Sequence, residues 1–265
     1  MPRSPRPLAL VTGASSGIGA SLARELARDG HDLILSARRV APMQALAGEL
    51  KASGASSTII RADLSQPGAA AALVQEIAAK GLVVDVLINA AGLGANGRFD
   101  ATDPVRVSEM LQVNVLALTE LTRLLLPGMI GRRKGQIMLL ASTAAFQPGP
   151  QMAVYCASKA YVLSFGEAIA YELKGSGVSV TTLCPGATET EFAAVARLEN
   201  SALFKGGMVP VMSADEVARI GYQALKSRRP VAITGLRNTI MAVSSKLSPT
   251  PLTLRIANWM MTAGK

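Results

Sequence analysis

Short apolar runs alternate along the chain with longer stretches in which apolar residues recur every three or four positions. Most of the runs are continuously apolar, without interleaved polar residues, which predicts strands that are buried on both faces. The runs are Leu8–Thr12, Asp32–Ala37, Ser57–Ala62, Val83–Asn89, Gln136–Ala141, Val178–Cys184 and Val231–Thr234. The pattern therefore predicts a parallel sheet of about seven strands.

The stretches between the runs have helical spacing. Two of them begin with helix start signals, because Asp103 precedes Pro104 and Ser213 is followed three residues later by Glu216. The stretches are Ile18–Asp29, Pro42–Ser53, Pro67–Lys80, Pro104–Gly131, Ala153–Lys174 and Ala214–Ser227. Alternating strands and helices predict an α/β fold, in which a doubly wound parallel sheet carries helices on both faces.

No segment rich in glycine, serine or proline divides the chain, so we expect a single domain over residues 1–265. Hydrophobic residues make up 49% of the sequence and charged residues 17%, which indicates a folded globular protein. The basic N-terminus, residues 1–7, lacks the apolar stretch of a signal peptide, and we find no run of the roughly 18–20 apolar residues that span a membrane. We expect a soluble cytoplasmic protein.

The formal net charge of +9 raises the question of a nucleic-acid partner. The basic residues are scattered, however, and no aromatic residues interleave with the tightest clusters, Arg38-Arg39 and Arg132-Arg133-Lys134. We therefore expect no nucleic-acid binding.

Few residues in the sequence could carry out thiol, metal or imidazole chemistry. Cys156 and Cys184 are the only cysteines, so neither a disulfide framework nor a metal site is predicted, and a reducing cytosol is indicated. We expect both thiols to pack as small apolar groups. His31 is the only histidine, and its place in a turn before an apolar run predicts a surface residue without a catalytic role.

A glycine-rich turn follows the first predicted strand and leads directly into a helix. Its glycines let the backbone approach a pyrophosphate, while the helix N-terminus supplies free N–H groups and a positive dipole end. This context predicts a dinucleotide site, although the spacing is G-x-x-x-G-x-G and not the commoner G-x-G-x-x-G. The residues predicted to bind the cofactor here are Gly13, Ser15, Ser16, Gly17, Ile18 and Gly19.

The end of the second predicted strand bears on the choice of cofactor. An acidic residue at this point would accept hydrogen bonds from the ribose of NAD, whereas arginine accommodates the 2′-phosphate of NADP. The strand is followed by Arg38 and Arg39 with no acid, and Ser15 can add a hydroxyl. The sequence therefore favours NADPH or NADP+ as the cofactor.

Tyr155 and Lys159 lie four residues apart at the start of a predicted helix, so their side chains share one face. A nearby ammonium favours the phenolate and is expected to lower the pKa of Tyr155 from its usual value of about 10. The hydroxyl would then serve as an acid in reduction and as a base in oxidation. An ordinary helical pair is the alternative when the motif is taken alone.

Polar residues follow two other predicted strands. Ser142 comes directly after the fifth strand, and Asn89-Ala90-Ala91-Gly92 ends the fourth. Ligands bind at the carboxyl ends of strands in open α/β sheets. Asn114 lies inside a predicted helix, where asparagine has poor propensity, which indicates a polar role.

Together these motifs resemble the short-chain dehydrogenase/reductase family over about Leu8 to Phe192, in this order and at these spacings. The resemblance implies a Rossmann-type fold and an NADP-dependent oxidoreductase. It rests on the glycine-rich turn, Asp63-Leu64, NAAG at 89–92 in place of the commoner NNAG, Asn114, Ser142, Tyr155-x-x-x-Lys159, and Pro185-Gly186-Ala187-Thr188-Glu189-Thr190.

The resemblance also implies roles. Tyr155 would be the catalytic acid/base, with Ser142 hydrogen-bonding the substrate oxygen. Lys159 would bind the nicotinamide ribose and tune Tyr155, and Asn114 would hold a water that links Lys159 to solvent. The further cofactor contacts would be Asp63 and Leu64 near the adenine, Asn89, Ala90, Ala91 and Gly92 along the cleft, and Pro185, Gly186, Thr188 and Thr190 at the carboxamide.

Two late segments concern substrate and assembly. We expect residues 189–212 to form a substrate lid, whose apolar content favours a hydrophobic carbonyl or alcohol, with ordinary packing as the open alternative. The apolar segment 240–265 is expected to pack on a partner subunit, with a membrane-surface helix as the alternative. The family resemblance implies a homodimer or homotetramer. The lid's apolar residues are Phe192, Val195, Leu198, Leu203, Phe204, Met208 and Met212.

These observations favour a reductase of a hydrophobic ketone or aldehyde, or a dehydrogenase of the matching alcohol. The rival interpretations are a catalytically silent NADP(H)-binding regulatory protein and a protein associated with a membrane surface. The presence of Asn114, Ser142, Tyr155 and Lys159 together argues against a silent protein.

Overall fold

A parallel sheet forms the centre of the molecule in the computed structural model, which describes residues 6–196, 198 and 211–262. Within these residues seven strands are paired in the order β3-β2-β1-β4-β5-β6-β9, and every pairing is parallel. The strands are β1 (Leu8–Thr12), β2 (Asp32–Ala37), β3 (Ser57–Arg61), β4 (Val86–Asn89), β5 (Gly135–Leu140), β6 (Val178–Cys184) and β9 (Val231–Ile233). All seven apolar runs form strands of this sheet, so the predicted doubly wound fold is confirmed.

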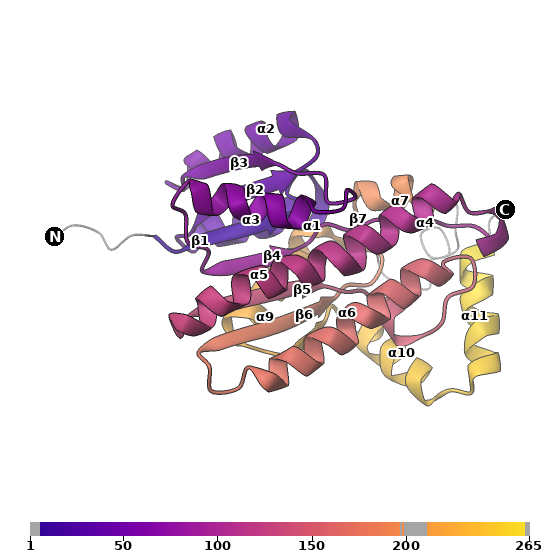
Figure 1. Cartoon of the computed structure of the whole chain (residues 1–265). Helices are drawn as coiled ribbons and strands as arrows, with labels where there is room; N and C mark the ends of the chain where they lie inside the picture. Colours follow the sequence, from indigo (N-terminus) through magenta and orange to yellow (C-terminus); the bar gives the residue numbers. More distant parts are fainter. Residues whose placement is uncertain (1–5, 197, 199–210, 263–265) are drawn as a thin grey trace.

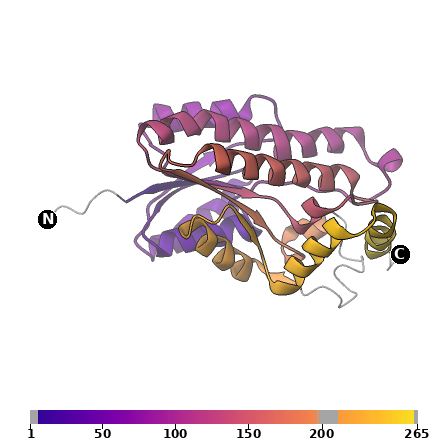
Figure 2. The same ribbon diagram turned by 90° about the horizontal axis from the view of Figure 1, so that it is seen from below.

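Helices cover both faces of the sheet, which Figure 2 shows edge-on between two layers. One layer contains α1 (Gly17–Arg28), α2 (Val40–Lys51) and α9 (Ala214–Lys226). The other contains α3 (Ala69–Ala79), α4 (Pro104–Leu111), α5 (Leu118–Gly131) and α6 (Ala153–Glu172). Each layer buries its own apolar cluster against the sheet, as expected for strands that are apolar on both faces.

The predicted helix Pro104–Gly131 is continuous but not uniformly α-helical. A π-helical turn, Gln112–Ala117, joins α4 to α5 and contains Asn114. Such turns are rare and occur mostly at functional sites. The segment Pro104–Gly131 is also the one helix, among the described residues, that is long and apolar enough to cross a membrane by length and composition. Its buried residues, Met110 and Leu121 among them, belong to the core cluster beside the sheet, as in a core helix.

Several predicted boundaries shift for local reasons. The helix predicted from Pro67 begins at Ala69, because Gly68 adopts a left-handed φ of 78° just before it. The helix predicted from Pro42 already begins at Val40. The prediction for His31 was wrong, since the side chain is buried and its Nδ1 lies 3.2 Å from the carbonyl oxygen of Leu26. Burial lowers the pKa of the His31 imidazole.

Apart from α9 and β9, the elements after β6 build the end of the molecule at which the strands terminate (Figure 1). The short strands β7 (Thr188–Glu189) and β8 (Met212–Ser213) pair there, and α7 (Glu191–Val195) lies between them in sequence. The apolar C-terminal segment forms two helices, α10 (Leu236–Leu247) and α11 (Thr250–Thr262), drawn in yellow. The expectation that this segment packs on a partner subunit missed its contact with its own chain, because its buried faces close one side of a cavity.

Candidate active site

A cavity of about 520 Å³ lies at the carboxyl ends of the strands. It lies at the point where the strand order reverses between β1 and β4, the usual ligand position in open α/β sheets. Every residue that the sequence predicted for the site lines this cavity except Asn89 and Asn114. The fold thus brings together motifs from seven separate stretches of the chain.

The glycine-rich turn and the turn after β4 touch each other at the cavity floor. Gly13 has a left-handed φ of 67°, and a Cβ on Gly13 would lie 2.8 Å from the backbone nitrogen of Ala91. The hydroxyl of Thr12 accepts hydrogen bonds from the backbone N–H groups of Ala90 and Ala91, at 3.1 and 3.2 Å. Only glycine at position 13 permits this approach of the two turns.

The N-terminus of α1 opens into the cavity without a side-chain cap. Ser16 is the N-cap residue, but its hydroxyl makes no capping hydrogen bond, and the first turn of the helix holds no acid. Its free N–H groups and positive dipole end therefore face the cavity. This cradle fits the pyrophosphate of a dinucleotide, to be held by Gly13 to Gly19.

Arg39 lies at the edge of the cavity beside the glycine-rich turn. Its Nη2 lies 3.2 Å from Oγ of Ser16 and 3.5 Å from Oγ of Ser15, and it forms an ion pair with Glu191 at 2.5 Å. Arg38 also lines the cavity, and its carbonyl accepts a hydrogen bond from Nε of Arg61. A cluster of cationic and hydroxyl donors thus borders the end of β2.

Asp63 and Leu64 line the cavity beyond β3. Oδ1 of Asp63 accepts hydrogen bonds from the backbone N–H of Ser65, at 3.1 Å, and from its hydroxyl, at 2.7 Å. Burial acts to raise the pKa of Asp63, but these bonds and the charges of Arg38 and Arg61 outweigh burial and lower it. The carboxylate is therefore ionised and held in place.

The placement of Asn89 differs from the prediction. Its side chain does not line the cavity; Nδ2 donates to the hydroxyl of Thr122 on α5, at 3.1 Å, in the buried core. Side chains of successive strand residues point to opposite faces, and here the amide points into the helical layer. Ala90, Ala91 and Gly92, by contrast, do line the cavity.

Asn114 joins the turn after β4 to α6. Its Oδ1 accepts from the backbone N–H of Leu93 at 2.8 Å, while Nδ2 donates to the carbonyl of Leu93 and to Oγ of Ser158. The side chain is fully buried behind Gly92, on which a Cβ would lie 3.6 Å from both Asn114 Oδ1 and Lys159 Nζ. Asn114 therefore positions the cavity wall beside Lys159.

Ser142 and Tyr155 meet at the cavity wall. Ser142 follows β5, where its Oγ accepts from the backbone N–H of Ala144 at 3.1 Å and donates to the carbonyl of Pro185 at 3.4 Å. The ring of Tyr155 packs against Phe192 of α7, with ring centroids 5.3 Å apart. Ser142 and Tyr155 are each about nine-tenths buried, and both line the cavity.

Lys159 lies one helical turn beyond Tyr155, and both residues line the cavity. Its Nζ donates to the carbonyl of Leu140 at 2.6 Å and lies 5.7 Å from the centre of the Tyr155 ring. Burial lowers the pKa of Lys159 to about 8. The spacing of four residues thus produces the predicted juxtaposition.

The predicted direction of the Tyr155 pKa was wrong. Burial raises the pKa of the phenol, and the hydrogen bond with Ser142 only opposes this rise. Desolvation of the phenolate is the largest cause of the rise. Tyr155 is therefore protonated at neutral pH and suited to donate a proton.

The segment Pro185–Thr190 lines a further part of the cavity, and its Thr190 lies beside Gly17 of the glycine-rich turn. The hydroxyl of Thr188 donates to the carbonyl of Gly186 at 3.0 Å, and Thr190 caps α7. A Cβ on Gly186 would lie 2.4 Å from Nδ2 of Asn238, a buried residue of α10 that also lines the cavity. Close packing at this glycine joins the cofactor motif to the C-terminal helices.

The far side of the cavity is apolar, and sequence reasoning missed part of it. Phe192, Val195 and Leu198 of the predicted lid line the cavity, whereas the predicted lid residues Leu203, Phe204 and Met208 lie outside the described residues. The missed residues come from α10 and α11 and include three methionines. They are Asn238, Met241, Ala242, Ser245, Ala257, Met260 and Met261.

The two cysteines are buried and free. Cys156 borders the cavity, where its Sγ leaves no room for a side chain on Gly149. Burial raises the pKa of Cys156 to about 11 and that of Cys184 to about 12. Both thiols are thus protonated packing groups, as expected from the sequence.

Comparison with known sequences points to one protein family. The profile described as short chain dehydrogenase matches residues 7–201. The ketoacyl reductase HetN of Nostoc sp. is 32% identical over 256 residues, 94% of this chain and 88% of that protein. A short chain dehydrogenase of Pseudocercospora fijiensis is 36% identical over 188 residues, 70% of this chain, and the matched part is 61% of the fungal protein.

Solved structures of similar proteins share the fold of this chain. A short-chain dehydrogenase from Sphingobium yanoikuyae in complex with NADPH has a TM-score of 0.79 at 31% identity, covering 91% of this chain and 94% of that one. A bulky-bulky ketone specific alcohol dehydrogenase from Comamonas testosteroni scores 0.76 at 27% identity, covering 91% and 92%. A short chain dehydrogenase/reductase from Burkholderia phymatum in complex with NAD scores 0.79 at 26%, covering 92% and 94%.

The profile match, the level of identity and the shared sheet topology agree with the residues gathered around the cavity. The chain belongs to the short chain dehydrogenase family of oxidoreductases.

Proposed function

We propose that this protein is an NADPH-dependent oxidoreductase that reduces the carbonyl group of a neutral, apolar ketone or aldehyde, or oxidises the matching alcohol. The observation that carries the proposal is that Ser142, Tyr155 and Lys159 line one cavity together with the glycine-rich turn. A ketoacyl reductase and a ketone-specific alcohol dehydrogenase among the similar proteins support the reaction class.

NADPH is favoured over NADH by the charges at the end of β2. Arg38 and Arg39 border the cavity there, beside the hydroxyls of Ser15 and Ser16. A planar guanidinium with adjacent hydroxyl donors suits a phosphate monoester. Since similar proteins bind NADPH in one structure and NAD in another, the arginines of this chain carry the preference.

When bound, NADPH supplies the hydride. Tyr155 then provides the proton, which passes from its Oη to the carbonyl oxygen as the carbonyl becomes an alcohol. Ser142 would hydrogen-bond that oxygen and orient it, and Lys159 would bind the nicotinamide ribose beside Tyr155. The raised pKa of Tyr155 keeps the phenol protonated at neutral pH, which favours the reductive direction.

The substrate side of the cavity supports a neutral apolar compound. The described residues there include Phe192, Met241, Met260 and Met261. The charged lining residues are Arg38, Arg39, Asp63, Lys159 and Glu191, and we assign them to the cofactor side. A substrate carboxylate would therefore lack a cationic partner at this end, where burial of an unpaired charge is costly.

The test is oxidation of NADPH, followed by the loss of its near-ultraviolet absorbance, with a panel of aldehydes, ketones, quinones and 3-ketoacyl thioesters. Replacement of the proton donor in Tyr155→Phe is expected to lower turnover by about 10²- to 10⁴-fold. The matched control is Tyr171→Phe, because Tyr171 lies on the same helix but is exposed, and its turnover should be unchanged.

NADPH binding and the melting temperature of Tyr155→Phe should match those of the wild type, since the ring and its contact with Phe192 remain. Turnover that survives in Tyr155→Phe would exclude Tyr155 as the proton donor. No turnover with any compound, together with tight NADPH binding, would favour the catalytically silent regulatory protein instead.

We also propose a cytoplasmic homodimer or homotetramer built over one domain. Exposed apolar residues lie on α5 and α6, among them Leu124, Tyr161 and Tyr171, and support association through these helices. The two free cysteines suit a reducing compartment.

A further inference from the structure

The two C-terminal helices present apolar stripes to solvent. On α10 the exposed residues Leu236, Ile240, Val243 and Leu247 recur at intervals of three or four, which places them on one face. On α11 the exposed residues Leu252, Ile256 and Trp259 have the same spacing. Each of these side chains is between 49% and 82% exposed, so the stripes are not part of the core of this chain.

The opposite faces of both helices are those that pack inward. Asn238 and Ala242 of α10 are buried, as are Thr253, Ala257 and Met260 of α11. The exposed apolar stripes therefore lie on the outer faces of the two helices and take no part in packing them onto the rest of the chain. Adjacent exposed apolar residues of this extent mark a site of interaction.

The charges of this hairpin are all of one sign. From Leu236 to Thr262 the sequence contains Arg237, Lys246 and Arg255 and no aspartate or glutamate, and all three cations are exposed. The combination of apolar stripes with a cationic, acid-free border is typical of helices that lie in the plane of a membrane surface. Trp259 adds a side chain that prefers the interface between lipid and water.

A second copy of this chain fits the same face poorly. In a twofold interface the same patch meets itself, so the three cations of one copy would face the three of the other without an acid between them. An anionic lipid surface supplies the missing negative charge and the apolar environment together. We propose that the outer face of α10 and α11, defined by these seven apolar residues and three cations, docks on an anionic bilayer surface.

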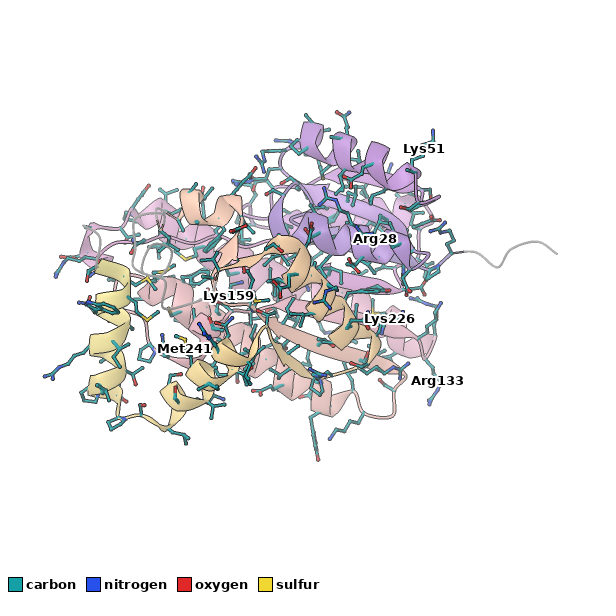
Figure 3. All side chains as sticks on the ribbon, turned by 180° about the vertical axis from the view of Figure 1, so that it is seen from behind. Arg28, Lys51, Arg133, Lys159, Lys226 and Met241 are labelled. Atoms are coloured by element: carbon teal, nitrogen blue, oxygen red, sulfur yellow. The ribbon has the colours of Figure 1, made fainter. Side chains whose placement is uncertain are left out.

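The docking face is continuous with the cavity. Met241 lines the cavity and is also 38% exposed on α10, and Met260 and Met261 line it from α11. Figure 3 shows Met241 on the side of the molecule away from Lys51 and Arg133, with Lys159 nearer the middle. Docking would therefore place the apolar end of the cavity next to the bilayer. The docking itself does not depend on the proposed reaction.

Trp259 makes the proposal directly measurable, because it is the only tryptophan in the chain. The intact protein is mixed with vesicles of phosphatidylcholine containing phosphatidylglycerol and, separately, with vesicles of phosphatidylcholine alone. We expect a blue shift of the Trp259 emission and co-sedimentation with the anionic vesicles only. Rising salt should weaken binding, since the cations act through screened attraction.

Single substitutions separate the apolar and charged contributions. Ile256→Gln should reduce the vesicle-bound fraction by about fivefold, whereas Val83→Gln should not, because Val83 is equally exposed but precedes β4. Arg255→Gln should weaken binding to anionic vesicles more than Lys51→Gln, whose lysine lies on α2 at the far end. Melting temperatures and NADPH binding would show that each variant is folded.

Three outcomes would overturn the proposal. The first is the absence of both the blue shift and co-sedimentation with anionic vesicles. The second is equal loss of binding in Ile256→Gln and Val83→Gln. The third is a concentration-dependent dimer that Ile256→Gln dissociates without any vesicle binding, which would assign the face to a second copy. If the intact protein binds anionic vesicles but reduces no carbonyl compound, that result would count against the proposed function alone.

Discussion

Arg39, which follows β2, and Glu191, at the start of α7, form an ion pair with 2.5 Å between Nη2 and Oε2. The same guanidinium reaches the hydroxyl of Ser16 in the glycine-rich turn. The residue that we propose to recognise a 2′-phosphate is thus already paired with a carboxylate of the predicted lid, residues 189–212. Glu191 and a cofactor phosphate would compete for one cation.

Two substitutions follow from this competition. Arg39→Ala should raise the Kd for NADPH about tenfold or more while leaving the Kd for NADH nearly unchanged, because a charge-assisted hydrogen bond to the phosphate is lost. Glu191→Gln should lower the Kd for NADPH, by at most about fivefold since the ion pair is half exposed. Fluorescence titration with both cofactors measures these effects.

Glu189→Gln is the control for the second substitution, because Glu189 is an exposed neighbour on β7 that does not pair with Arg39 in the described structure. An equal change for NADH and NADPH in Arg39→Ala would contradict a role in phosphate recognition.

The buried ammonium of Lys159 predicts a dependence of stability on pH. Its pKa falls from 10.5 in the unfolded chain to about 8 in the fold, so the native state binds fewer protons between these values. As the pH falls from 10.5 towards 8, Lys159 gains a proton in the unfolded chain but not in the fold, so its contribution to the free energy of unfolding decreases. Between pH 8 and pH 10 this contribution should rise by about 2 kcal/mol.

Denaturant unfolding of the wild type and of Lys159→Met isolates this contribution. Cys156 and Cys184 have raised pKa values and lower the stability as the pH rises through 9, but they do so in both proteins. The difference between the two proteins should move in favour of the wild type as the pH rises. A difference that stays constant from pH 8 to pH 10 would refute the lowered pKa.

Gly186 is predicted to tolerate no side chain. A Cβ there would lie within 2.7 Å of three atoms of the Asn238 amide, which is buried and donates to the carbonyl of Thr234 at 2.6 Å. Gly186→Ala should therefore lower the free energy of unfolding by about 1–3 kcal/mol, measured in urea.

Gly48→Ala is the matched control, because Gly48 lies inside α2 with open space around it. Alanine is the better helix former, so this variant should gain up to about 1 kcal/mol. Equal stability of the two variants would mean that Asn238 gives way without cost.

The two thiols should be inert in the native protein. Because burial raises their pKa values to about 11 and 12, Cys156 and Cys184 hold almost no thiolate at pH 7.5. Iodoacetamide should label neither residue until denaturant is added, as followed by mass spectrometry. Rapid native labelling of Cys156 would show that the cavity wall opens to reagents.

The sequence was sufficient for the sheet and for most of the residues that line the cavity beside the glycine-rich turn. Strands buried on both faces are continuously apolar, so the runs from Leu8–Thr12 to Val231–Ile233 are visible without any tertiary information. The glycine-rich turn and the pair Tyr155 and Lys159 are equally local, because their geometry depends on backbone conformation and on a spacing of four in a helix.

Three features were decided only by the tertiary structure. The side chain of Asn89 turns to Thr122 on α5, since the twist and packing of the sheet decide which face each strand residue meets. The pKa of Tyr155 rises because many distant residues exclude water from the phenol, an effect that no spacing reveals. The apolar C-terminal segment closes the cavity with Met241 and Met260, because helices with two apolar faces do not specify from sequence which face turns inward.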